Sequence, residues 1–165
     1  MDRTELEKQF TDKVRNSQGI VHKVCRMYGQ NEDHRKDLFQ EIMVQLWRSF
    51  PSFRGESQFS TWMYRVALNV AIQDFRKVNR RALIFFRSRE FMDVEDVAYD
   101  FAQDEQLRTL HQAIGHLDKL DKAIIMLHLD GNSNEVIGDI VGITPNYVRV
   151  KMNRIKKKIS EKVKN

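Results

Sequence analysis

The sequence predicts an all-α protein made of two small helical domains joined by a flexible acidic linker. Apolar residues recur with helical period along most of the 165-residue chain, and the few glycines and prolines fall between the periodic segments. A basic block from Arg76 to Arg89 is followed by residues 90–105, which carry acidic side chains and no Lys or Arg. We therefore expect one domain over residues 1–81, the linker over 82–104 and a second domain over 105–165.

Composition restricts the class of protein. The net charge of +5 suits a polyanionic partner. A single cysteine, Cys25, excludes an intramolecular disulfide and favours a reducing compartment. The N-terminus lacks the apolar stretch of a signal peptide, and no apolar run approaches the roughly 20 residues that a membrane span needs. These features predict a soluble cytoplasmic protein with no membrane span.

Three helices are expected in the first domain. They run from about Glu5 to Tyr28, from about Arg35 to Phe50 and, after a break at Pro51 and Gly55, from about Phe59 to Arg81. The buried side of the first, by period, holds Ile20, Val21, Val24 and Tyr28. The buried side of the second holds Phe39, Ile42, Met43, Leu46, Trp47 and Phe50, and its opposite side carries Asp37, Glu41, Gln45 and Arg48.

The third helix has an apolar side and a cationic side. The apolar side holds Met63, Val66, Ala67, Val70, Ala71 and Val78, and the other side holds Gln58, Trp62, Arg65, Asn69, Arg76 and Arg80. Trp62 is thus placed among the cations, where its ring offers a face for a stacked base while arginines hold phosphates. Together with Phe53, Ser60 and Thr61, this pattern predicts a surface that binds unpaired DNA. For Phe59 and Tyr64 taken alone, ordinary core packing is favoured.

The second domain opens with a helical unit and ends in a helix-turn-helix. The unit begins near Glu105 and ends at Gly131, with apolar positions Leu107, Leu110, Ile114, Leu117, Ile124, Ile125, Leu127 and Leu129. The inner side of the next helix holds Val136, Ile137, Ile140 and Val141. Gly138 permits a close approach, and Gly142 permits the left-handed conformation of a helix stop. Thr144 can cap the last helix and Pro145 can occupy its first position.

The last helix presents a candidate surface for reading duplex DNA. Its inward positions are Val148, Met152, Ile155 and Ile159, and its outward positions are Asn146, Val150, Asn153 and Lys157, flanked by Tyr147, Arg149 and Arg154. Asn and Arg can bond base edges in the major groove, an exposed Val150 can contact a thymine methyl group, and lysines suit phosphates. An αα-hairpin with a solvated lysine tail is the alternative, but it leaves the exposed Val150 and the basic excess unexplained.

Three segments resemble one known family. They are Asp37-Leu38-Phe39-Gln40-Glu41 followed by Leu46-Trp47-Arg48, the string Phe-Ser-Thr-Trp-Met-Tyr-Arg-Val-Ala-Leu-Asn from Phe59 to Asn69, and the helix-turn-helix from Ser133 to Arg154. The chain resembles the bacterial sigma factors of RNA polymerase, in particular the small extracytoplasmic-function group that keeps only the second and fourth sigma domains. It departs from the common pattern at Asn134-Glu135-Val136 (often Tyr-Glu-Glu), Gly138 (usually Ala) and Lys151 (commonly Arg).

The resemblance implies partners and residue roles. The implied partners are core RNA polymerase (beta-prime clamp helices and beta flap), promoter DNA both double-stranded and melted, and an anti-sigma factor or another recruiting or restraining protein. The implied polymerase-binding residues are Asp37, Leu38, Gln40, Glu41, Trp47 and Arg48. The implied minus-ten residues are Phe53, Ser60, Thr61, Trp62, Arg65, Asn69, Gln73, Arg76, Lys77 and Arg80, of which Phe53 and Asn69 would hold an extruded base. The implied minus-thirty-five residues are Thr144, Asn146, Tyr147, Arg149, Val150, Lys151, Asn153, Arg154 and Lys157.

Two other classes of protein account for part of the sequence. A free-standing helix-turn-helix regulator with an N-terminal sensing or dimerisation domain would explain residues 132–158 equally well, but it leaves the stripe with Trp62 and Asn69 without a purpose. An enzyme is disfavoured, because no carboxylates, histidines and nucleophile recur at catalytic spacing. His22 and Cys25 lie within one helical turn but lack a second pair of ligands for zinc, so core packing is the better interpretation of Cys25. We expect no catalytic residue, metal or cofactor.

Overall fold

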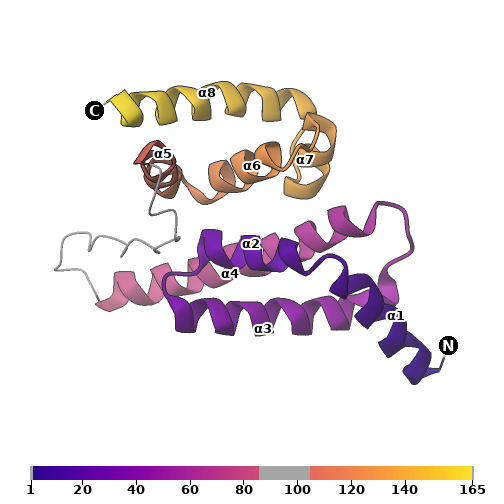
Figure 1. Cartoon of the computed structure of the whole chain (residues 1–165). Coiled ribbons are helices and arrows are strands. Elements are labelled where there is room, and N and C mark those ends of the chain that lie inside the picture. The colour runs from indigo at the N-terminus through magenta and orange to yellow at the C-terminus, as the bar shows by residue number, and fades with distance from the viewer. Residues whose placement is uncertain (1, 86–104, 165) are drawn as a thin grey trace. The chain divides into compact units, whose positions relative to one another are not determined.

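The protein is described by a computed structural model over residues 2–85 and 105–164, with side chains omitted for residues 74–85. Within these ranges the chain is helical and contains no β-strand (Figure 1). It forms two compact units, residues 1–95 and residues 96–165. The predicted all-α fold with two helical domains is confirmed. Most of the predicted linker, residues 82–104, lies outside the described residues.

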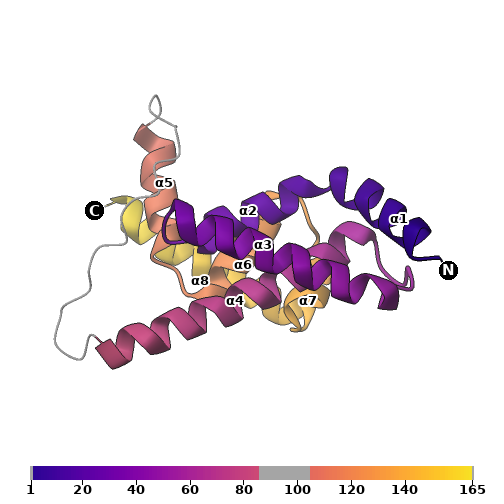
Figure 2. The ribbon, with the colours of Figure 1, turned by 90° about the horizontal axis from the view of Figure 1, so that it is seen from below.

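Four α-helices and one 3-10 turn are described in the first unit. They are α1 (Arg3–Arg15), α2 (Gln18–Tyr28), α3 (Glu32–Ser49), the 3-10 turn η1 (Phe50–Ser52) and α4 (Phe59–Phe85). Helices α2, α3 and α4 pack against one another in pairs, and both ribbon views show α2 and α3 next to α4 (Figures 1 and 2). Their shared core includes Val21, Val24 and Tyr28 from α2, Leu38, Ile42 and Leu46 from α3, and Met63, Ala67, Leu68, Val70 and Ala71 from α4.

The prediction of a single helix from Glu5 to Tyr28 is wrong, because α1 and α2 are separate helices. The chain turns at Asn16 and Ser17, and the Ser17 amide donates to the Val14 carbonyl at 2.9 Å. Short polar side chains compete with the hydrogen bonds of a helical backbone, so an Asn-Ser pair favours such a break. The break directs α1 away from α2 and allows Phe10 of α1 to pack against later aromatic residues of this unit.

Capping explains where α3 begins and ends. The helix starts at Glu32, earlier than the predicted Arg35, because the Asn31 side chain accepts a hydrogen bond of 2.8 Å from the His34 amide. Pro51 lies in the 3-10 turn after the helix, and Gly55, with φ +73°, supplies the left-handed conformation in the loop to α4. Helix α4 continues past the predicted end at residue 81, so residues 82–85 of the predicted linker are helical.

The second unit contains four described helices. They are α5 (Glu105–Gly115), α6 (Lys119–Leu129), α7 (Asn134–Val141) and α8 (Pro145–Lys164), and α8 packs against each of the other three. The core includes Ala113, Ile114, Leu117, Ile124, Leu127, Ile137, Ile140, Val148, Met152 and Ile155. Gly131, with φ +84°, follows α6 as predicted. Leu107 and Leu129 follow the apolar period but are 40% and 64% exposed, so they do not belong to this core.

The geometry of the helix-turn-helix is confirmed in detail. Gly142 has φ +78° and ends α7, and Pro145 is the first residue of α8. The Thr144 hydroxyl accepts a hydrogen bond of 3.2 Å from the Tyr147 amide, as expected of a cap. A β-carbon on Gly138 would lie 2.5 Å from the Ile143 carbonyl oxygen, so glycine permits a close approach of the turn to α7.

Candidate nucleic-acid interface

An aromatic cluster forms where α1, the end of α3 and the start of α4 meet. It consists of Phe10, Trp47, Phe50, Phe53, Phe59 and Trp62. The ring centroid of Trp62 lies 5.1 Å from that of Phe53 and 5.3 Å from that of Phe59. Trp62 therefore packs among aromatic rings, a surrounding that the period of its own helix did not indicate. It is half-buried, as are Phe53 and Phe59, so part of each ring stays accessible to a ligand.

Polar side chains continue from this cluster along α4. Arg65, Asn69 and Gln73 follow Trp62 at helical spacing, and Asn69 and Gln73 are exposed. Ser60 and Thr61, at the start of the helix, are half-buried. Tyr64 is buried in the core, as favoured for that residue alone. The side chains of Arg76, Lys77 and Arg80 lie outside the described residues. The aromatic cluster and this stripe together offer stacking surfaces beside hydrogen-bonding groups, which is the chemistry that unpaired bases require.

A second surface lies on the outer face of α3. Asp37, Gln40, Glu41 and Arg48 are exposed there, as the pattern predicted. Leu38 is instead 1% exposed and packs in the core, so its side chain is removed from this surface. Trp47 is half-buried with its ring 5.1 Å from Phe10.

Sequence reasoning missed Val44 on the same face of α3. Its side chain is 48% exposed, and it follows Gln40 and precedes Arg48 by one helical turn. The sequence did carry a signal for this site, because Val44 is an apolar residue that lies among polar positions and outside the apolar period of its helix. An exposed apolar centre with a polar rim is typical of a protein-binding surface.

The outer side of α8 carries most of the predicted duplex-reading residues. Those that are exposed are Thr144, Asn146, Tyr147, Arg149, Asn153, Arg154 and Lys157. Arg149 Nη2 donates to Asn146 Oδ1 at 2.9 Å, so this hydrogen bond orients the two side chains relative to each other. Val150 is half-buried rather than exposed, so its exposure no longer counts against the alternative of an αα-hairpin.

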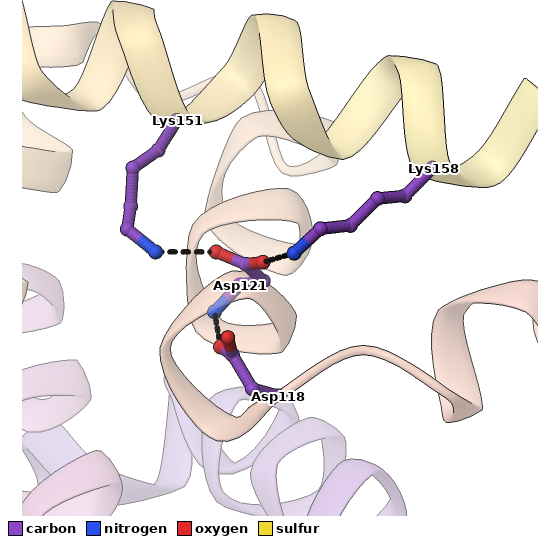
Figure 3. A network of polar contacts seen from close by, with 4 residues as sticks. All are labelled: Asp118, Asp121, Lys151 and Lys158. Carbon is purple, nitrogen blue, oxygen red and sulfur yellow. Dashed lines mark hydrogen bonds and ion pairs between the residues drawn. The ribbon is translucent and has the colours of Figure 1, made fainter.

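Lys151 does not belong to this outer side. Its Nζ atom lies 2.8 Å from Asp121 Oδ1, and its side chain is 15% exposed. Lys158 reaches the other oxygen of the same carboxylate at 2.8 Å (Figure 3). The expected role of Lys151 in contacting DNA is therefore corrected, because its ammonium group is already bound to an internal carboxylate.

No group of three or more His, Cys, Asp or Glu that could hold a metal ion occurs among the described residues. His22 instead stacks on Phe39, with ring centroids 4.9 Å apart. Cys25 is buried, and this burial raises the pKa of its thiol to about 11. No helix within residues 2–85 and 105–164 is long and apolar enough to cross a membrane.

Comparison with known proteins connects these surfaces to one family. The family model described as sigma-70 region 2 matches residues 14–81. The ECF RNA polymerase sigma-E factor of Haemophilus influenzae is 30% identical over 138 residues, which cover 77% of this chain and 73% of that protein. The RNA polymerase sigma-H factor of Pseudomonas aeruginosa is 28% identical over 137 residues, covering 76% and 71% of the two chains.

Two solved structures share the fold. The sigma factor RpoE of Bartonella quintana, in complex with the anti-sigma factor NepR, superposes with a TM-score of 0.73 at 20% identity, covering 95% of this chain and 98% of that one. CnrH, in complex with the cytosolic domain of CnrY, gives a TM-score of 0.65 at 19% identity, covering 94% and 87%.

The fold and the sequence similarity together define a factor of transcription initiation. The chain belongs to the extracytoplasmic-function group of RNA polymerase sigma factors. The resemblance inferred from the motifs is confirmed, and this function is favoured over a free-standing helix-turn-helix regulator.

Proposed function

We propose that this sigma factor binds core RNA polymerase through the outer face of α3. The observation that carries the proposal is the exposure of Val44, an apolar side chain surrounded by Asp37, Gln40, Glu41 and Arg48. Burying Val44 against a partner would remove apolar area from water, while the polar rim would fix the register of the contact. By family resemblance the partner surface is the beta-prime clamp helices.

Promoter melting is assigned to the aromatic cluster and the polar stripe of α4. An extruded base costs a few kcal/mol to unstack and unpair, and stacking with hydrogen bonds can offset this cost. Phe53 and Trp62 offer partly accessible rings, and the exposed Asn69 offers an amide that can pair with a base edge. Arg76, Lys77 and Arg80, further along α4, are assigned to the strands on sequence grounds.

Reading of the upstream duplex is assigned to α8. Asn146, Arg149 and Asn153 supply hydrogen-bonding groups for base edges, and Arg154 and Lys157 supply positive charge for phosphates. With the melting surface in residues 1–81 and the reading surface in residues 105–165, the two domains would bind one promoter bivalently, and the linker would set their effective concentration.

Two further contacts with proteins follow from this role. An open pocket of about 410 Å³ in the second unit is lined by Ala113, His116, Leu117, Lys158, Glu161 and Lys162, and we assign it to the beta flap of the polymerase. Two proteins of similar fold were solved in complex with another protein, one with the anti-sigma factor NepR and the other with the cytosolic domain of CnrY, which supports an anti-sigma factor or another protein partner here. We place the protein in the cytoplasm with the polymerase and assign it no catalytic step of its own.

Core binding can be tested by titrating purified core polymerase with labelled variants of the full chain. We expect Val44→Asp and the double variant Asp37→Ala with Gln40→Ala to weaken binding at least tenfold, with circular dichroism and melting unchanged. The matched control is Gln18→Ala, an exposed residue at the start of α2, which should bind as the unmodified protein does. Unchanged affinity in both α3 variants would refute the proposed docking face.

A further inference from the structure

One carboxylate holds the last helix at two points. Asp121, on α6, is 2% exposed, and its two oxygens accept from Lys151 and Lys158 of α8 at 2.8 Å each. Its backbone amide donates to Asp118 Oδ1 at 2.9 Å, so the residue is also fixed in the first turn of α6. Figure 3 shows both lysine side chains reaching from α8 to this single carboxylate, with Asp118 beside it.

The spacing of the two lysines determines what this contact fixes. Lys151 and Lys158 are seven residues apart, which places them on one side of α8 at positions about two turns apart. One contact would still allow α8 to rotate or slide. Two contacts to one buried point restrict both its rotation about its own axis and its position along α6.

The side of α8 opposite Lys151 carries two of the residues assigned to base edges. At about 100° per residue, Arg149 and Asn153 each lie about 160° from Lys151, and both are exposed. Any change in the rotation of α8 on α6 would therefore turn these side chains by the same angle relative to DNA. Hydrogen bonds to base edges tolerate little misorientation, so the rotation of α8 bears on sequence discrimination more than on charge attraction.

An ion pair to a buried carboxylate is not the simplest way to stabilise such a contact, although the Lys158 side chain, unlike that of Lys151, stays 53% exposed. Desolvation of a carboxylate offsets much of its attraction to a lysine, and well-packed apolar residues often stabilise a fold as well or better. What a directional polar contact adds is a preference for one geometry. The pKa of Asp121 supports an ionised group: burial would raise it, but hydrogen bonds from Lys151 and Lys158 outweigh burial and hold the pKa below its ordinary value.

We propose that Asp121 is a positioning residue for promoter reading, which sets the rotation of α8 through Lys151 and Lys158 and keeps Lys151 off the DNA. This inference rests on the proposed role of α8 as the duplex reader. Lys151 thus acts within the protein, although it stands in the helix that contacts the promoter.

The assignment of Lys151 can be tested by the salt dependence of binding. The full chain, assembled with core polymerase, is titrated onto a duplex carrying the upstream element of a promoter found by run-off transcription. Each lysine that neutralises a phosphate contributes about 0.9 to the slope of log affinity against log salt. We expect Lys157→Met to reduce the slope by about this amount and Lys151→Met to leave it unchanged. An equal loss of slope in Lys151→Met would overturn the assignment. An unchanged slope in Lys157→Met, together with an unchanged affinity in Asn153→Ala, would refute the reading role of α8 itself.

The positioning role is tested by discrimination between that duplex and a scrambled one. We expect Asp121→Asn to lower the affinity ratio about tenfold, and the conservative Asp121→Glu to stay within about threefold of the unmodified protein. A triple variant, Asp121→Leu with Lys151→Met and Lys158→Met, leaves no buried charge unpaired. It should regain the melting temperature of the unmodified protein without regaining the ratio of affinities for the two duplexes. The proposal fails if Asp121→Asn keeps the ratio or if the triple variant restores it. Should Asp121→Asn not fold, the triple variant decides alone.

Discussion

Gly138 of α7 lies so close to the turn after the helix that a β-carbon there would come within 2.5 Å of the Ile143 carbonyl oxygen. That oxygen belongs to the backbone, so it cannot move aside as a flexible side chain could. We expect Gly138→Ala to destabilise the second unit by about 1 to 3 kcal/mol, as measured by hydrogen exchange of α7 and α8 peptides.

The matched control is Gly115→Ala at the end of α5, where no atom beyond the neighbouring helix backbone lies within 4 Å of the added carbon. Alanine favours the helix there, so stability should stay equal or rise by up to about 1 kcal/mol. Equal effects of the two alanines would contradict the close approach at Gly138.

The contribution of Asp121 to stability should depend on pH. Its lowered pKa means that the stabilisation is fully present above the unfolded-state pKa of 3.8 and is lost as the pH falls through the folded-state value. The raised pKa of Lys158, caused by its hydrogen bond to Asp121, gives stabilisation that is present below 10.5 and lost as the pH rises through the folded-state value. We expect Asp121→Asn to unfold about 1 to 3 kcal/mol more easily at pH 7, by denaturant titration.

The difference between the two proteins should begin to shrink on acidification below about pH 4 and be smallest below the folded-state pKa of Asp121, where both proteins carry a neutral side chain at position 121. Other carboxylates titrate in both proteins and cancel in this comparison. A difference that stays constant down to the lowest pH at which both proteins fold would contradict the ionised state of Asp121.

Loss of the α4 surface should impair promoter opening more than closed-complex formation. Asn69→Ala removes an exposed amide without disturbing the core, so a fall in opening of about tenfold, measured by permanganate reactivity of unpaired thymines, would reflect lost base contacts. Trp62→Ala should reduce opening further, and it also removes a ring packed against Phe53 and Phe59.

The melting temperature of each variant separates lost contacts from lost folding. Asn69→Ala should melt like the unmodified protein, and Gln18→Ala should match it in both assays. If Asn69→Ala opened promoters normally, the assignment of this residue to base capture would be wrong.

The thiol of Cys25 should react slowly in the folded protein. Burial raises its pKa to about 11 from an ordinary 9.0, so only about one thiol in a thousand is ionised at pH 8. We expect Ellman's reagent to label the native chain at least a hundredfold more slowly than the chain in denaturant. Rapid labelling in native buffer would show that α2 opens readily or that Cys25 is not buried.

Local rules predicted the helix-turn-helix well because its determinants are close in sequence. Gly142, Thr144 and Pro145 each act on a backbone group within four residues, so their roles can be read from order alone. The same holds for the break before α2, where Asn16 and Ser17 carried a signal that helical periodicity over residues 5–28 concealed.

Other features depend on partners distant in the sequence. Lys151 and Lys157 are both cations on one helix, and only Asp121, thirty residues before Lys151, distinguishes them. The helical period places Trp62 on the polar side of its own helix, yet its ring packs against those of Phe53 and Phe59. Periodicity describes the faces of one helix, whereas these contacts are decided by which helices meet.

Run-off transcription on a fragmented genomic library, with purified core polymerase from a related bacterium, gives the most direct test of the proposed role in initiation. With the protein present, we predict discrete new start sites that share an upstream motif and that disappear with the Val44→Asp variant. No new starts, together with tight binding of a specific duplex by the protein without polymerase, would contradict initiation and indicate a free-standing regulator.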